Sequence, residues 1–206
     1  MRGVRAALPF LRQRLPFLAV LLVAVGWLAV LQFHGSVVPL PSFLSGVFLV
    51  GYLAPSLVAA GIIGSAQAST AALHESLSPR PVGWADRGWV PLLTLLAGGS
   101  WLAAAWWEAM APPDAVAAAR NLVGFVGVAL VARRVAPGAT AAAAPVYLAV
   151  LAAVLGAPQV VILSWVHAEA SVVWAAMMAA AWGVIGWLVG TGCAPLREAA
   201  LQGIDR

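Results

Sequence analysis

Six long apolar segments divide the chain, and shorter stretches rich in glycine, proline or charged residues separate them. A helix needs about 20 predominantly apolar residues to cross the roughly 30 Å hydrocarbon core of a bilayer. The pattern therefore predicts an all-α polytopic membrane protein with six transmembrane helices. The predicted spans are residues 16–33, 43–68, 89–107, 115–132, 141–157 and 170–191.

Composition supports this fold class and excludes one kind of ATPase. Hydrophobic residues make up 63% of the chain and charged residues 9%, whereas soluble domains carry about 25% charged residues. All eleven basic residues are arginines, so the chain has no lysine. Because a P-loop needs its lysine to reach the β- and γ-phosphates, any ATP-driven work requires a separate subunit.

The arginines follow a topological pattern. Ten of the eleven fall on the two tails and on the loops after the second and fourth spans, all on one side of the predicted helices. Cytoplasmic loops carry an excess of arginine and lysine, so both termini are predicted to be cytoplasmic. These arginines are Arg2, Arg5, Arg12, Arg14, Arg80, Arg87, Arg133, Arg134, Arg197 and Arg206.

The same pattern explains the sequence pI of about 10.6. The positive charge matches membrane orientation and contact with anionic lipid, so we expect no nucleic-acid partner. The composition, rich in alanine and arginine and free of lysine, is typical of a GC-rich bacterial genome, which gives a bacterial cytoplasmic membrane as the predicted location. The predicted parts are an amphipathic helix at 1–15, a six-helix membrane domain at 16–192 and a cytoplasmic tail at 193–206.

Residues 1–15 place leucine and valine on one helical stripe and arginines off it. A basic amphipathic stretch beside a span usually lies in the membrane interface, although a solvated flank is the alternative. The second span is predicted to continue as a short helix through 71–77, ending before Pro79. Such a helix suits partner docking, and an ordinary polar loop is the alternative. The candidate docking residues are Gln67, His74, Glu75, Arg80 and Arg87.

Small residues mark candidate contacts between helices, because glycine lets two backbones approach closely in a membrane. The candidates are Gly61, Gly64, Gly124 and Gly183.

Arg120 and Asn121 fall inside the fourth span, after Pro112-Pro113 and Asp114, which we expect to act as the helix N-cap. An arginine at depth costs about 2.5–3.5 kcal/mol unless it pairs or reaches the interface. Glu108 is the nearest candidate partner in sequence. Glu108, Arg120 and Asn121 therefore form either a polar element facing a substrate path or an interfacial ion pair, with Glu169 as a second possible partner.

Residues 158–167 follow the short fifth segment and contain an apolar run too short to cross a bilayer. We expect this run to re-enter the membrane from the outer side, buried in protein. The alternative is one kinked helix from 141 through 166.

Catalytic motifs are absent from the sequence. The chain has no G-x-S-x-G, no H-E-x-x-H and no C-x-x-C, and its single cysteine, Cys193, cannot form an intrachain disulfide. The three histidines are isolated, so no catalytic residues and no metal site are expected. The chain fits a permease or a scaffold better than an enzyme.

Several short motifs resemble the membrane subunits of ABC-2 type transporters. They are Arg120-Asn121-Leu-Val-Gly124, the pair Arg133-Arg134, Pro145 in the next span, and the segment 75–81. The resemblance implies a homo- or heterodimer of permease chains with ABC ATPase subunits that supply the ATP and Mg²⁺ sites, this chain holding no cofactor. It also implies a coupling helix at 67–77, an interfacial helix at 2–14, and an export path between spans two and five of the two halves. The very short outer loops depart from the family.

Two other functions remain open. A substrate-capture subunit of an energy-coupling importer would have a ligand pocket formed within one chain. A membrane scaffold or accessory subunit would bind partners without dependence on ATP.

Overall fold

A computed structural model of the chain describes eight segments. These are residues 17–33, 37–39, 47–67, 82–136, 139–155, 165–166, 168–169 and 171–191.

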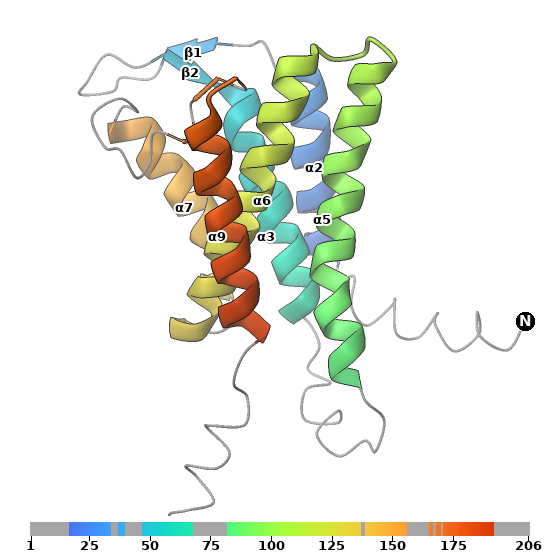
Figure 1. The fold of residues 1–206 in the computed structure, drawn as a ribbon, viewed down its shortest axis with the longest axis vertical. Helices are drawn as coiled ribbons and strands as arrows, with labels where there is room; N and C mark the ends of the chain where they lie inside the picture. Colours follow the sequence, from blue (N-terminus) through green and yellow to red (C-terminus); the bar gives the residue numbers. More distant parts are fainter. Residues whose placement is uncertain are drawn as a thin grey trace, which may run out of the picture.

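Six helices make up almost all of the described structure and stand side by side in one bundle (Figure 1). They are α2 (Phe17–Phe33), α3 (Val50–Gln67), α5 (Val82–Trp106), α6 (Pro112–Val135), α7 (Ala139–Leu155) and α9 (Val173–Thr191). Each overlaps one of the six predicted apolar segments, so the described residues are helical as predicted, apart from two short strands.

Two stretches of helix in the described residues are long and apolar enough to cross a membrane. They are Gly88–Trp106 in α5 and Pro112–Val135 in α6. The apolar parts of the other four helices are shorter. Of the apolar stretch in α5, 22% is buried inside the protein, whereas 67% of the apolar stretch in α6 is buried. Thus α6 is an inner helix and α5 is a peripheral one.

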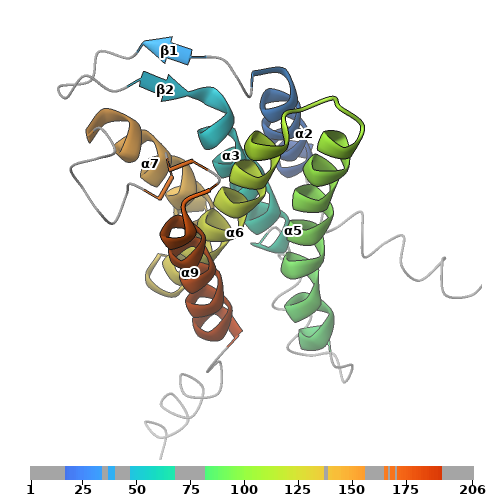
Figure 2. The same cartoon turned by 45° about the horizontal axis from the view of Figure 1, so that its top comes forward.

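Two short strands, which the hydrophobic pattern does not predict, precede α3 (Figure 2). The strands β1 (Val37–Pro39) and β2 (Val47–Leu49) pair antiparallel, with Val38 opposite Phe48. The predicted start of the second span at residue 43 is therefore wrong, because the helix begins only at Val50. Valine and phenylalanine favour a pleated strand when a partner strand is present. The hydrophobicity of residues 47–49 alone does not reveal that partner.

The turn between α5 and α6 corrects the predicted N-cap. The N-cap is Ala111, and Pro112 and Pro113 occupy the first helical positions. Proline suits these positions because its fixed φ is helical and its missing N–H would be unpaired there anyway. Asp114 instead lies in the first turn, where its charge is favourable beside the helix dipole.

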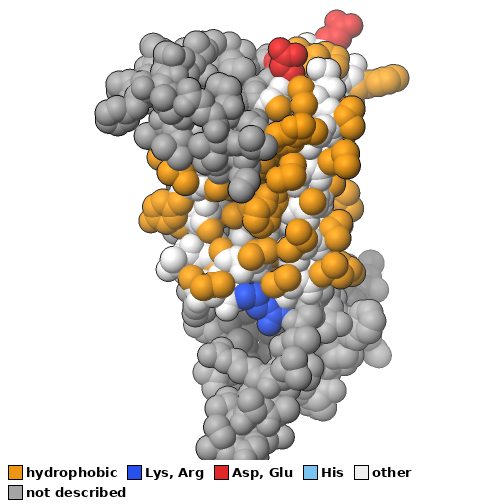
Figure 3. Space-filling view, turned by 60° about the vertical axis from the view of Figure 1, so that its left-hand side comes forward, with side chains coloured by type: hydrophobic (Ala, Val, Ile, Leu, Met, Phe, Trp, Pro, Cys, Tyr) orange, Lys and Arg blue, Asp and Glu red, His pale blue; other side chains and the backbone are white. Residues whose placement is uncertain are grey.

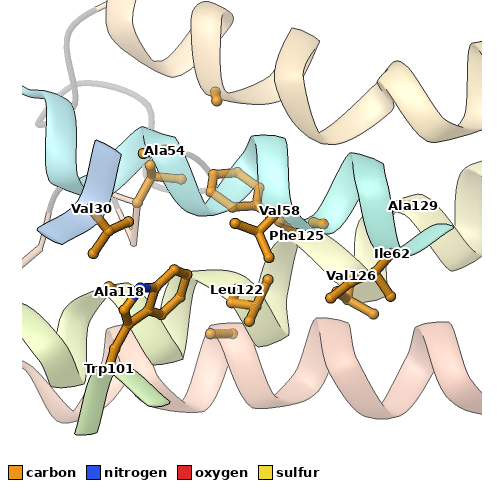
Figure 4. Close-up of a cluster of buried hydrophobic side chains, with 14 of the residues drawn as sticks. Val30, Ala54, Val58, Ile62, Trp101, Ala118, Leu122, Phe125, Val126 and Ala129 are labelled. Carbon is orange, nitrogen blue, oxygen red and sulfur yellow. The ribbon is translucent and has the colours of Figure 1, made fainter. Parts of the chain in front are cut away.

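The centre of the bundle lies between α3 and α6. Helix α3 packs against α2, α5, α6 and α7, while α6 packs against α3, α5, α7 and α9. Figure 4 shows Val58 and Ile62 of α3 beside Leu122 and Phe125 of α6, with Trp101 of α5 at the end of this group. All five of these side chains are buried.

Glycines set the two closest helix contacts. A Cβ atom added at Gly61 would lie 2.7 Å from the main-chain oxygen of Ala19, so α2 and α3 meet there. A Cβ at Gly186 of α9 would lie 2.6 Å from the Cα of Gly127 in α6. Any side chain at either position would force the helices apart, since real Cβ atoms do not approach this closely.

The outward faces of the bundle are apolar along its length. Exposed large hydrophobic side chains occur on all the outer helices, for example Val25 on α2, Leu95 on α5, Tyr147 on α7 and Leu188 on α9. Figure 3 shows acidic side chains at one end of the described part and basic side chains at the other, with apolar side chains between them.

Candidate functional site: a buried arginine beneath the α7–α9 connection

Arg120 and Asn121 lie side by side on α6 and are both buried, with exposures of 9% and 0%. Arg120 lies eight residues after the start of the helix at Pro112, or about 12 Å along its axis at 1.5 Å per residue. A charged side chain inside an apolar bundle requires compensating polar groups. Here these groups come from the connection between α7 and α9.

Main-chain carbonyl groups of that connection surround the guanidinium. Nη2 of Arg120 donates to the oxygen of Ala168 at 2.7 Å and to the oxygen of Trp165 at 3.1 Å. Nη1 donates to the oxygen of Glu169 at 3.0 Å. These oxygens carry the partial negative charge that stabilises the cation, and hydrogen bonds to charged groups contribute about 1.5–3 kcal/mol each.

Asn121 links the arginine to the same connection. Its Oδ1 accepts from Nε and Nη2 of Arg120 at 3.2 Å and 3.1 Å. Its Nδ2 donates to the main-chain oxygen of Val166 at 2.8 Å. The amide therefore fixes the orientation of the guanidinium, and all three nitrogen atoms of Arg120 are engaged.

Trp165 closes this site from the side. Its side chain is fully buried, and its ring centroid lies 5.4 Å from that of Phe125 at an interplanar angle of 54°. A Cβ atom at Gly124 would lie 2.5 Å from Cη2 of Trp165, so the glycine provides the space for the indole ring. Packing and hydrogen bonding thus fasten residues 165, 166, 168 and 169 to one face of α6.

The structure changes the expected role of Glu108. This residue is exposed in the turn after α5, with φ of 59°, and it is not among the described partners of Arg120. Glu169 does contact Arg120, but through its main-chain oxygen. The eight-residue helical rise between Pro112 and Arg120 carries the guanidinium away from the turn and toward the carbonyl groups.

The other predicted site residues are dispersed. Gln67 ends α3 and Arg87 lies in α5, and the orientations of these two side chains lie outside the description. His74, Glu75 and Arg80, the proposed docking segment, lie outside the described residues, as do the helix at 1–15, the tail after residue 191 and most of the 158–167 segment. Of that last segment, Trp165 and Val166 are described, and both form part of a buried turn.

The small residues proposed for helix packing differ in their surroundings. Gly61 contacts α2 closely, Gly124 faces Trp165, and a Cβ at Gly183 would lie 2.8 Å from Val123. Gly64 has ordinary room, since a Cβ atom added there would lie 3.9 Å from its nearest neighbour, the Cβ of Ala19.

Two open apolar grooves flank α5. The α5–α9 groove has a volume of about 400 Å³ and α6 as its floor. Its lining residues are Val90, Pro91, Thr94, Leu95, Val123, Val126, Leu130, Ala180, Gly183, Val184 and Trp187. The α2–α5 groove has a volume of about 480 Å³ and includes Trp27, Gly61, Ser65 and Leu96 in its lining.

Two hydrogen bonds between helices hold α5 beside these grooves. Nε1 of Trp27 in α2 donates to Oγ of Ser100 at 2.7 Å. Nε1 of Trp89 in α5 donates to Oγ of Ser65 in α3 at 3.2 Å. Each serine hydroxyl in turn donates to a main-chain oxygen of its own helix, so both polar groups are satisfied within the bundle.

Two features of the site were missed from the sequence. The carbonyl cluster at 165–169 has no sequence signal, because every residue type carries the same main-chain oxygen. The second missed feature is the close contact of Gly127 with Gly186, which does have a sequence signal. The pairs Gly124-x-x-Gly127 and Gly183-x-x-Gly186 repeat the spacing of Gly61-x-x-Gly64.

Among the described residues, no group of three or more histidine, cysteine or acidic side chains could hold a metal ion. No known protein family, characterised protein or solved structure matches the chain.

Proposed function

We propose that the chain is the membrane-spanning permease subunit of an ATP-driven exporter of the ABC-2 type. The observation that carries this proposal is the helical bundle with apolar outward faces and charged side chains at its two ends (Figure 3). This arrangement suits a bilayer, in which every main-chain group must be satisfied within helices. The transport step rests on the sequence resemblance to ABC-2 permeases.

The helix lengths support six spans. The four shorter helices contain 17, 18, 17 and 19 residues. At 1.5 Å per residue they extend about 26–29 Å, close to the hydrocarbon thickness of a bilayer. The end of the bundle that carries Arg133 and Arg134 would face the cytoplasm, and the end that carries Glu108 would face outward.

The grooves favour a permease over a substrate-capture subunit. A capture subunit needs a concave pocket with a few convergent polar groups that fix the ligand. The two described grooves are open and apolar, and they run along helix faces. Such surfaces suit contact with lipid or with another helix.

Burial and exposure of the helices guide where we place the second permease chain. Helix α3 is buried within one chain, with Val58, Ile62 and Ile63 at most 1% exposed. None of its residues 53–66 is exposed, so in our proposal α3 does not meet the second chain. Helix α7 does present an exposed face, through Tyr147, Val150 and Leu151, so in our proposal the partner permease meets α7.

Energy would come from a separate ATPase, because the chain has no lysine for a P-loop. That subunit would bind ATP and Mg²⁺ and would dock on residues 67–77. The dimer would be completed by a second permease chain, identical or distinct.

The test is affinity purification of the full chain from its native membrane in mild detergent, with identification of the proteins that accompany it. We expect a P-loop ATPase, whose recovery falls in the Glu75→Ala/Arg80→Ala variant. An Arg197→Ala/Arg206→Ala variant is the matched control and should retain the ATPase. Recovery of the chain alone, or only with partners that lack a P-loop, would contradict the transporter proposal and support a scaffold.

A further inference from the structure

We propose that the α5–α9 groove, together with Arg133 and Arg134, binds one anionic phospholipid. The groove takes an acyl chain and the two guanidinium groups take the phosphate. This inference rests on the membrane insertion contained in the proposed function, but it does not depend on transport or on an ATPase.

The floor of the groove leads directly to the arginines. Val123, Val126 and Leu130 line the groove from α6, and they form one helical stripe at spacings of three and four residues. At about 100° per residue, Arg133 and Arg134 lie about 50° to either side of that stripe. Arg134 follows Leu130 by one helical turn, a rise of about 6 Å. The charged pair therefore stands at the cytoplasmic end of the groove.

The walls of the groove suit a hydrocarbon chain. Of the side chains that line it, only that of Thr94 is polar, and its hydroxyl donates to the main-chain oxygen of Val90 at 2.8 Å. The groove thus offers an apolar surface to its occupant. Its volume of about 400 Å³ lies within the range of about 300–1,000 Å³ typical of small-molecule sites.

Arg134 is already positioned for a headgroup. Its Nε donates to the main-chain oxygen of Val189 at 2.6 Å, which ties the side chain to the end of α9. Val189 lies two residues after Trp187, which lines the groove. Both arginines are exposed, and no acidic side chain pairs with either of them in the described part of the chain. Paired guanidinium groups bind phosphate oxygens through parallel N–H···O bonds.

The charge at the end of the groove selects this occupant over a helix from a second copy. The outer faces of these helices are apolar, so a second copy would fill the groove without using the arginines. A phospholipid with a net negative charge uses both the apolar groove and the basic end.

The experiment measures lipid binding to the purified, delipidated full chain by native mass spectrometry. The probes are dioleoylphosphatidylglycerol, dioleoylphosphatidylcholine and water-soluble glycerol phosphate. We expect preferential binding of phosphatidylglycerol, with no displacement by glycerol phosphate. The Arg133→Gln/Arg134→Gln variant should lose about thirtyfold in phosphatidylglycerol affinity, at about 1 kcal/mol for each arginine near the headgroups. Its phosphatidylcholine affinity should fall less, because the choline cation offsets the charge of the phosphate in that lipid.

Two variants fill the groove from opposite walls. Ala180→Phe acts from α9 and Thr94→Phe from α5, and each should weaken the binding of both lipids. Ala181→Phe is the matched control, because Ala181 is exposed on α9 and does not line the groove. Arg197→Gln/Arg206→Gln is the control for lost charge. Both controls should bind lipid like the unmodified chain, and agreement between the two filling variants excludes a local folding defect in one of them.

Equal binding of the two lipids would overturn the proposal. So would an arginine variant that keeps its preference, filling variants that match Ala181→Phe, or displacement by glycerol phosphate, which would identify a site for free phosphate. These outcomes are separate from the ATPase test: a lipid site without an ATPase leaves this inference standing, and an ATPase without a lipid site refutes it alone.

Discussion

Replacing Arg120 by methionine tests whether the guanidinium holds the α7–α9 connection. Methionine keeps much of the aliphatic volume and removes every hydrogen bond to the main-chain oxygens of Trp165, Ala168 and Glu169. A buried acceptor left without a donor costs about 1–3 kcal/mol. For these three main-chain acceptors the gross loss is at most about 3–9 kcal/mol, because the hydrogen bonds to Ala168 and Glu169 are only partly buried.

Two effects reduce that loss. Removing the charge recovers the cost of keeping an arginine at depth, about 2.5–3.5 kcal/mol. The freed loop also shifts, so that some of its carbonyl groups find other donors. We therefore expect a net destabilisation of about 2–4 kcal/mol. For a chain of this size, 1 kcal/mol corresponds to a shift of about 2–4 °C in the melting temperature, so Arg120→Met should melt about 5–15 °C lower.

The assay combines thermal unfolding in detergent with hydrogen exchange. Amides of residues 165–169 should exchange faster in Arg120→Met, while amides of residues 58–63 in the buried helix α3 should exchange as before. Arg133→Met is the matched control: it removes an exposed arginine from the same helix and should shift the melting temperature by less than about 2 °C, as surface substitutions usually do. An Arg120→Met protein with an unchanged melting temperature and unchanged exchange at 165–169 would show that Arg120 does not hold the α7–α9 connection.

Three other predictions concern packing and topology. Gly186→Ala should destabilise the bundle by about 1–3 kcal/mol through overpacking, whereas Gly99→Ala, whose Cβ would have nothing within 4 Å, should be neutral, as thermal unfolding in detergent will show. A double-mutant cycle of Trp27→Phe and Ser100→Ala should give a coupling energy of about 0.6–1.7 kcal/mol. Additive effects would show that this hydrogen bond does not stabilise the bundle. A cysteine placed at residue 74 in a cysteine-free background should react with an impermeant thiol reagent only from the cytoplasm, and labelling from outside would reverse the topology.

Hydropathy alone predicted the number and the approximate bounds of the helices. This was possible because most apolar segments are bounded by residues that start or stop a helix, such as Pro112 at the first position of α6. The strand at 47–49 was missed because its apolar sequence continues into α3 without a polar break. Only the partner strand, ten residues earlier in the register Val38 to Phe48, distinguishes strand from helix there.

The candidate site was predictable in its residues but not in its contacts. Arg120 and Asn121 stand out because charged and amide side chains are rare within the apolar segments. Their partners could not be read from side chains, since the acceptors on the α7–α9 connection are main-chain oxygens. The sequence therefore pointed to Glu108, a carboxylate close in sequence, where the folded chain uses the carbonyl groups of residues more than forty positions away.

The geometry at Arg120 favours a structural role over a place in a substrate path. All three of its nitrogen atoms are engaged by the chain itself, and Asn121 fixes the plane of the guanidinium. Lysine carries the same charge but lacks the planar guanidinium. Arg120→Lys therefore keeps the positive charge and removes the geometry of the hydrogen-bond donors. If the carbonyl cluster required only a cation, Arg120→Lys would melt near the unmodified chain. Because the acceptors are arranged around three separate nitrogen atoms, we expect it to melt close to Arg120→Met instead.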